Sequence, residues 1–169
     1  MNCSRGPHQW SRGDRLIYTA TLIPFLTAFV GAAYVLATEA IYLVVVFLLL
    51  YALLNVFQAG CCVGCPYRGR FCPAVFGVYL ANLLSATVYR NRTFDQRFFR
   101  LNANLAEVFL LATLLFPTYW LAASNWVYVI IFLALVGLHV VTFFPTICPK
   151  CSYNDTCPGG QAATKLFKR

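Results

Sequence analysis

Hydrophobic residues occur along this chain in long blocks rather than at the spacing of an amphipathic helix. Four blocks carry at most one ionisable residue each, at 16–37, 40–60, 101–123 and 126–147. A helix needs about 20 apolar residues to cross a bilayer, so each block is long enough to span one. A soluble four-helix bundle would need a polar stripe on every helix, and "IYLVVVFLLLYALL" has none. We therefore predict an all-α integral membrane four-helix bundle, with residues 1–169 as a single domain.

A shorter apolar segment, "PAVFGVYLANLLSATVY" at 73–89, lies between spans two and three. A span here would be short, and it would move the four arginines after it to the other side of the membrane. We predict a re-entrant or interfacial helix instead, with Asn82 and Ser85 on its more polar side. A fifth span remains the alternative, and it would separate the two cysteine groups described below.

Basic residues decide the orientation. The chain has 13 Lys and Arg against 5 Asp and Glu, a net charge of +8, yet only 11% of its residues are charged. Every basic residue lies before span one, between spans two and three, or after span four. The positive-inside rule therefore predicts a multi-pass protein of the inner membrane with both termini in the cytoplasm. This bias explains the net charge, so we expect the lipid bilayer and other membrane subunits as partners, and no nucleic acid.

Cysteines gather in two predicted cytoplasmic loops, 61–72 and 148–157, and the spacing Cys-x2-Cys occurs in both. The cytosol disfavours structural disulfides, so clusters there more often bind metal or perform chemistry. Two such turns supply four thiolates, enough for a zinc ion or an iron–sulfur cluster. The candidate metal ligands are Cys61, Cys62, Cys65, Cys72, Cys148, Cys151 and Cys157.

These patterns leave several functions open. The leading interpretation is a redox or structural subunit of a membrane complex, in which the two turns meet where spans two and four pack. A membrane thiol–disulfide oxidoreductase is the second interpretation, and whether the protein is an enzyme stays open. A carrier or transporter of a soft metal ion is the third. An accessory subunit whose cysteines only lock loops is the fourth.

One stretch also carries a family resemblance. "CCVGCPYRG" fits C-x3-C-P-x-x-G when Cys61 and Cys65 are taken as the pair. It resembles the cysteine motif in the four-span membrane domain of the NosR/NapH-like ferredoxin-type respiratory proteins. The resemblance implies electron transfer and favours an iron–sulfur cluster over zinc. The second cysteine loop departs from that motif, and the ferredoxin domain of that group is absent from this sequence.

Two ionisable residues lie within the predicted spans, Glu107 in the third and His139 in the fourth. Both fall in the cytoplasmic half, where burial in lipid is costly, so we expect them to face the bundle interior and to be able to meet. A proton relay, or His139 as an extra metal ligand, is the functional interpretation. Hydrogen bonding between helices is the structural one.

Overall fold

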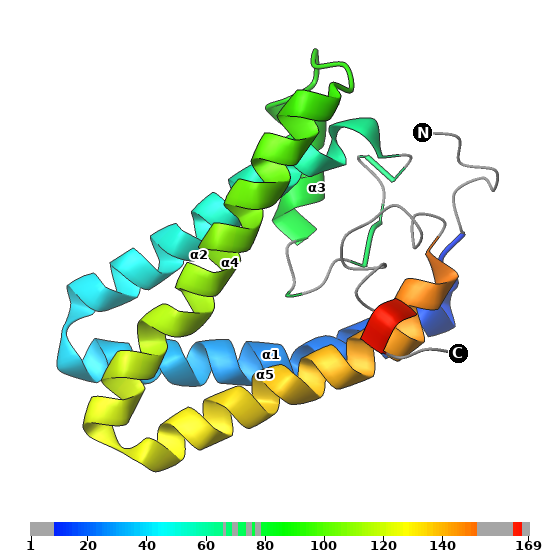
Figure 1. Cartoon of the computed structure of the whole chain (residues 1–169). Coiled ribbons are helices and arrows are strands. Elements are labelled where there is room, and N and C mark those ends of the chain that lie inside the picture. Colours follow the sequence, from blue (N-terminus) through cyan, green and yellow to red (C-terminus); the bar gives the residue numbers. More distant parts are fainter. Residues whose placement is uncertain are drawn as a thin grey trace.

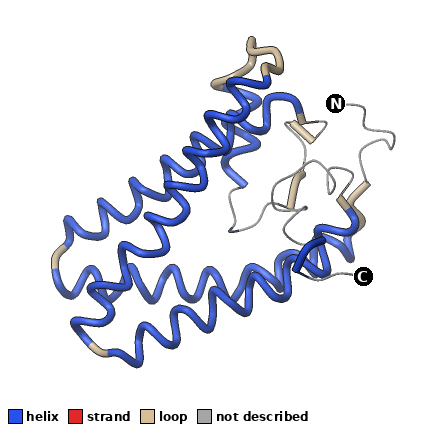
Figure 2. Tube along the Cα trace, in the orientation of Figure 1, coloured by secondary structure: helices blue, strands red, loops and turns tan. Residues whose placement is uncertain are grey.

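The computed structural model describes residues 9–65, 67–68, 71–73, 76, 79–151 and 164–166. Four long helices carry the predicted spans, namely α1 (Arg12–Glu39), α2 (Ile41–Cys61), α4 (Gln96–Ser124) and α5 (Trp126–Ile147). A short helix α3 (Tyr79–Thr87) and two 3-10 turns, η1 (Cys62–Gly64) and η3 (Cys148–Lys150), follow α2 and α5. Across these described ranges Figure 2 shows helices and loops without a strand. The all-α prediction is confirmed, and all four long helices are apolar and long enough to cross a membrane.

Short polar side chains set where three of the long helices begin. Ser11 and Asp14 form a capping box at α1, in which Ser11 Oγ accepts from the Asp14 N–H at 3.1 Å. The carboxylate of Asp95 accepts from Arg97 N–H at α4, and the amide oxygen of Asn125 accepts from Val127 N–H at α5. Helix α4 therefore starts five residues ahead of its apolar block, in the polar part of the chain.

The helices are arranged as two pairs that form a V (Figure 1). Helix α1 packs mainly against α5, and α2 mainly against α4. The pairs meet at the closed end, where Ala40 alone separates α1 from α2 and Asn125 alone separates α4 from α5. Ser124 donates a hydrogen bond to Glu39 there, at 3.0 Å. The predicted packing of spans two and four is wrong, because α2 and α5 belong to different arms of the V.

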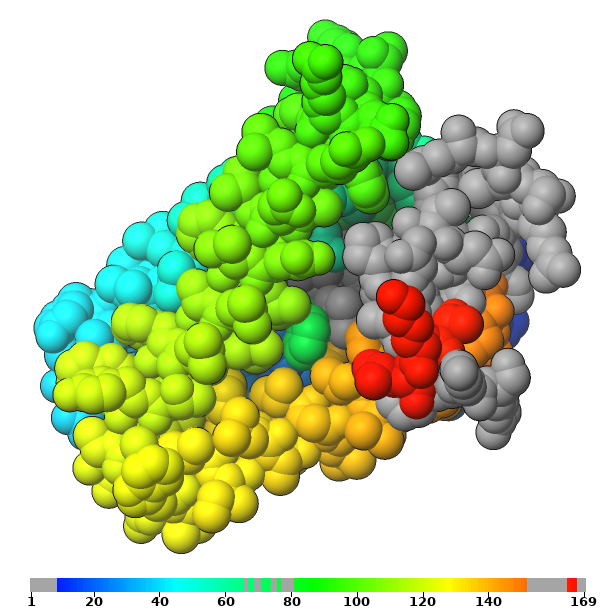
Figure 3. Space-filling view, viewed as in Figure 1, coloured from blue at the N-terminus to red at the C-terminus, as the bar shows by residue number. Residues whose placement is uncertain are grey.

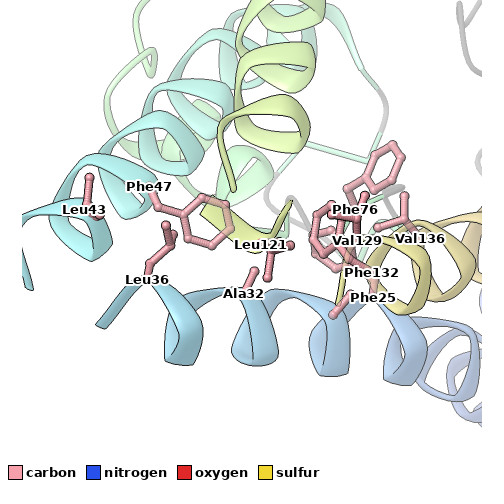
Figure 4. Close-up of a cluster of buried hydrophobic side chains, with 11 residues drawn as sticks. Phe25, Ala32, Leu36, Leu43, Phe47, Phe76, Leu121, Val129, Phe132 and Val136 are labelled. Carbon is pink, nitrogen blue, oxygen red and sulfur yellow. The ribbon is translucent and has the colours of Figure 1, made fainter. Parts of the chain in front are cut away.

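A hydrophobic core joins the two pairs near the closed end (Figure 4). Each helix contributes large apolar side chains, and Leu36 of α1 and Phe47 of α2 are almost completely buried. Leu121 of α4 and Phe132 of α5 pack in the same cluster. Towards the open end the two pairs diverge, so the space between them has to be filled by some other part of the chain.

The segment between α2 and α4 fills that space. Phe76 is buried and packs in the same core as Phe47 and Phe132, although it lies in the loop before α3. Helix α3 then leads back along α2, with Ala81 packed against Leu54. Among the described residues of 73–89, α3 has nine residues and reaches only about 13 Å at 1.5 Å per residue, too short to span a bilayer. This length agrees with the predicted re-entrant or interfacial helix, and we keep the name re-entrant segment for residues 73–89.

Candidate cysteine site

The two Cys-x2-Cys stretches adopt the same local structure. Each forms a 3-10 turn in which the second cysteine's N–H donates to the first cysteine's carbonyl at 3.1 Å, from Cys65 to Cys62 and from Cys151 to Cys148. The backbone then becomes extended in both, with φ and ψ of −85° and 134° at Cys65 and −78° and 129° at Cys151. The near-repeat in the sequence is therefore a repeat in structure, placed after the second and the last long helix.

Cysteines from both turns pack on one aromatic cluster at the open end. Its buried members are Trp10, Tyr18, Tyr67, Phe143 and Ile147. Four half-buried cysteines pack against it, and we call them the thiol group: Cys65, Cys72, Cys148 and Cys151. Helices α2 and α5 are not paired, so the chain after α2 has to cross the open end to reach α5. The structure thus brings the two loops together by a route that the sequence did not indicate.

Hydrogen bonds to α3 fix the first cysteine loop. Two guanidinium nitrogens of Arg68 donate to the Ser85 carbonyl, at 2.8 and 3.1 Å, and one of them also donates to the Tyr89 carbonyl. These carbonyls lie at the C-terminal end of α3, where helix carbonyls lack partners and a cation is favoured. Asn82 of α3 donates to the Tyr67 carbonyl at 2.7 Å. Asn82 and Ser85 are buried, so the prediction that they face a more polar side is wrong.

An ion pair holds the second loop, and a cation–π contact holds the first loop, against the start of α1. Lys150 Nζ lies 2.6 Å from Asp14 Oδ1, which ties η3 to the capping box of α1. The guanidinium of Arg15 lies over the Phe71 ring, 5.1 Å from its centroid. Three basic side chains, Arg15, Arg68 and Lys150, therefore hold the loops that carry the thiol group.

The remaining predicted ligands are placed differently. Cys61, in the last turn of α2, donates from Sγ to the Phe57 carbonyl at 3.8 Å, and Cys62 begins η1. Neither packs on the aromatic cluster that holds the thiol group. Cys157 lies outside the described residues. Within the described part of the chain, no three Cys, His, Asp or Glu side chains are gathered closely enough to hold one ion. Which cysteines would ligate a metal therefore stays a prediction.

Both ring nitrogens of His139 are used inside the protein. Its Nδ1 lies 2.6 Å from the Thr21 carbonyl, and its Nε2 accepts from the Phe76 N–H at 3.1 Å. A carbonyl only accepts, so Nδ1 carries the proton and the imidazole is neutral. The ring is fully buried and has Phe25 on one side and Phe143 on another. His139 thus joins α1, α5 and the re-entrant segment, and this arrangement leaves no ring nitrogen for a metal.

Glu107 is not brought to His139. Its side chain is exposed on α4, whereas we expected it to face the bundle interior.

Tyr51 is a partner of the re-entrant segment that the sequence analysis did not identify. Its hydroxyl donates a hydrogen bond to the Phe76 carbonyl at 3.0 Å. A tyrosine in the middle of a mostly apolar span carries a hydroxyl that needs an acceptor when it is buried, and that was the available signal.

The fold and the placement of its apolar surface define a multi-pass membrane protein of four helices. No protein-family model matches the chain, and neither a curated protein nor a solved structure matches it. The function therefore has to be argued from the thiol group and its surroundings.

Proposed function

We propose that the protein holds a soft metal centre, an iron–sulfur cluster or a zinc ion, through cysteine thiolates of both loops. It would serve as a redox or structural subunit of a membrane complex. The observation that carries this proposal is the convergence of Cys65, Cys72, Cys148 and Cys151 on one aromatic cluster. Two loops 76 residues apart, counted from Cys72 to Cys148, have no need to meet if their cysteines only fill space locally.

The chemistry of the surroundings supports this proposal. Thiolates are the ligands that soft and borderline metals prefer, and four of them suit either centre. The aromatic cluster packs against one side of the thiol group. Cys157 follows Cys151 in the same loop and would be a further donor. The resemblance of "CCVGCPYRG" to the NosR/NapH-like motif favours the iron–sulfur centre.

A dithiol–disulfide function is the second candidate. The observation in its favour is that four thiols from two loops pack on one aromatic cluster. In that case two thiols would be oxidised to a disulfide, releasing two protons and two electrons to an oxidant such as a protein disulfide.

Metal analysis of the purified protein separates the two candidates. We expect bound iron with visible absorption, or bound zinc without it, and we expect Cys65→Ser and Cys148→Ser to lose the metal to a similar degree. Cys61→Ser tests the motif pair, because Cys61 lies in the same loop but away from the aromatic cluster. Retained metal would leave Cys61 out of the ligand set, and loss of metal would support the pair of Cys61 and Cys65. Loss of metal in the variants of one loop only would refute a shared centre. A metal-free protein whose accessible thiols fall by two on mild oxidation would establish the dithiol function instead.

We further propose that the open end of the V faces the cytoplasm of the inner membrane. The start of α1, the first cysteine loop and the end of α5 all contribute to one aromatic cluster, so they lie on the same side. The chain's basic residues lie before or in the first turns of α1, between α2 and the apolar part of α4, or after α5, and positive-inside bias then selects that side. Reporter fusions after Arg100 and after Arg169 should both read cytoplasmic. Opposite readings would overturn the orientation.

A further inference from the structure

The turn between α3 and α4 carries a cluster of exposed basic side chains. We call it the arginine patch, and it consists of Arg90, Arg92, Arg97 and Arg100. Figure 3 shows this part of the chain, coloured green, projecting at the top of the molecule. Asp95 is the one acidic residue in the sequence 90–100, and its carboxylate is engaged as the N-cap of α4. No carboxylate in the described part of the chain forms an ion pair with an arginine of the patch.

Basic side chains near the thiol group are held by partners within the protein, and the patch differs from them in this respect. Lys150 pairs with Asp14, and Arg68 donates to carbonyls at the end of α3. The four charges of the patch lie close in sequence and repel one another, and Asp95 offsets only one of them. The patch is therefore complementary to an anion that the described chain does not supply.

The patch lies at the level of the lipid headgroups. Arg97 and Arg100 precede the apolar block of α4, which starts at Leu101. They lie at most about 6 and 1.5 Å along the helix from Leu101, at 1.5 Å per residue, and their spacing of three places them on the same side of the helix. The headgroup layer adds about 5–7 Å to each side of the hydrocarbon core. Both guanidinium groups can therefore reach the phosphates of that layer.

Apolar side chains are exposed beside the patch. Val88 is 68% exposed and Phe94 is 43% exposed, and both lie in the same turn as the arginines. Basic and apolar side chains exposed together are typical of a surface that lies in the membrane interface. This combination favours a lipid over a soluble acidic protein, because the protein has no acyl chain to cover Val88 and Phe94.

Contacts with the first cysteine loop and with α4 hold the turn in place. A Cβ on Gly64 would overlap the Phe94 ring, so this ring lies directly against η1. The guanidinium of Arg92 lies 5.2 Å from the centroid of the Phe98 ring, which brings it to the first turn of α4, where Arg97 also lies. The patch is therefore partly preorganised, which lowers the entropy cost of binding a ligand.

We propose that the arginine patch binds an anionic phospholipid whose headgroup carries two phosphates, as in cardiolipin. A guanidinium binds phosphate oxygens through two parallel N–H···O bonds. A phosphodiester has two free oxygens and accommodates about two arginines in this way, so four arginines suit a headgroup with two phosphates. Basic pockets at the membrane surface bind such headgroups. The binding involves neither the thiol group nor a metal, so it goes beyond the proposed function and stands independently of it.

Mass spectrometry of the intact protein, released from detergent with added lipid, tests the proposal. We expect one cardiolipin to bind at least about 5-fold more tightly than phosphatidylglycerol at equal phosphate concentration. Arg97→Gln and Arg100→Gln should each weaken cardiolipin binding by about 5-fold, the value for one arginine near an anionic headgroup. Arg12→Gln is the matched control, because it removes one charge at an exposed position at the start of α1. It should leave the affinity for cardiolipin unchanged.

A variant with the opposite effect keeps the test decisive. Asp95→Asn keeps a side-chain oxygen for the N-cap of α4 and removes the negative charge beside the patch, so it should tighten cardiolipin binding by up to about 5-fold. All the substituted positions are exposed, so the melting temperatures should change little. Equal affinities for cardiolipin and phosphatidylglycerol, or an equal loss in Arg12→Gln and Arg97→Gln, would refute the proposal. Binding of polyglutamate without a preference among lipids would assign the patch to an acidic protein surface instead.

Discussion

The backbone N–H of Phe76 donates a hydrogen bond to Nε2 of His139 at 3.1 Å, across 63 residues of sequence. The carbonyl of Phe76 accepts from Tyr51 at 3.0 Å, so one residue of the re-entrant segment is bonded to both arms of the V. A segment at this depth cannot rely on water to satisfy its backbone, and buried protein partners replace it. His139 and Tyr51 therefore allow non-helical backbone to lie between the helix pairs.

His139→Leu should lower the free energy of unfolding by about 1–3 kcal/mol, because it leaves the Phe76 N–H buried without an acceptor. His139→Gln keeps a donor and an acceptor and should lose less. Thermal unfolding of the purified protein measures both, with Thr146→Val at an exposed position of the same helix as the control. Metal content should be unchanged in these variants. Loss of metal without a change in melting temperature would instead make His139 a ligand.

Phe76 provides an unusual test, since its φ of 56° lies in the left-handed region that favours glycine. Phe76→Ala removes the ring from the core and keeps the unfavourable backbone, which should cost about 3–5 kcal/mol. Phe76→Gly removes the same ring but relieves the backbone, so it should be more stable than the alanine variant by about 1 kcal/mol. Melting temperatures of the two variants give the order directly. An alanine variant that is the more stable would show that the backbone is not strained there.

Glycines at two positions should respond in opposite ways to alanine. A Cβ at Gly60, in the last turn of α2, would overlap the side-chain amide of Asn102 on α4. Asn102 is buried and bonded to the Phe98 carbonyl, so it has little room to move, and Gly60→Ala should cost about 1–3 kcal/mol. A Cβ at Gly137 meets nothing within 4 Å. Gly137→Ala should therefore be neutral or stabilise α5 by up to about 1 kcal/mol. Equal effects at the two sites would contradict the close approach of α2 and α4.

Acid should weaken the link between η3 and α1. Hydrogen bonds from Lys150 and from Ser11 hold the pKa of the Asp14 carboxyl well below its ordinary value of 3.8. A carboxyl whose pKa is lower in the folded protein than in the unfolded protein stabilises the fold at a pH above its unfolded-state pKa. This stabilisation is lost as the pH falls towards the folded-state pKa. Between about pH 5 and about pH 3 the melting temperature should therefore fall less in Asp14→Asn than in the unaltered protein. If the melting temperatures of the two proteins fell equally with pH, the Asp14 carboxyl would add nothing to the stability of the fold.

Apolar block length was enough to predict the four spans, because a bilayer imposes that length on any helix that crosses it. The repeated Cys-x2-Cys spacing likewise indicated two equivalent turns, since that geometry is local. The pairing of helices was not predictable in the same way. The apolar blocks are hydrophobic all round, so no stripe marks which neighbour each helix packs against.

The exposure of Glu107 and the hydrogen bonds of His139 also could not be predicted from the sequence. Both residues are single ionisable groups in apolar spans, and their sequence contexts are alike. Their environments differ because α5 lies against α1 and the re-entrant segment, whereas Glu107 lies on the uncovered side of α4. Such differences depend on contacts between residues that are distant in the sequence. Phe76 decides the role of His139 through its backbone N–H, and nothing in the sequence around Phe76 indicates this.

The long separation between Phe76 and His139 also constrains how the protein is made. Synthesis proceeds at about 5–20 residues per second, so His139 leaves the ribosome roughly 3–13 s after Phe76. Until then the first two helices have no α5 to complete the bonding of Phe76, and Cys65 and Cys72 have no Cys148 and Cys151 beside them. The thiol group can therefore gather only after α5 and η3 have been synthesised, because two of its four cysteines belong to the last loop of the chain.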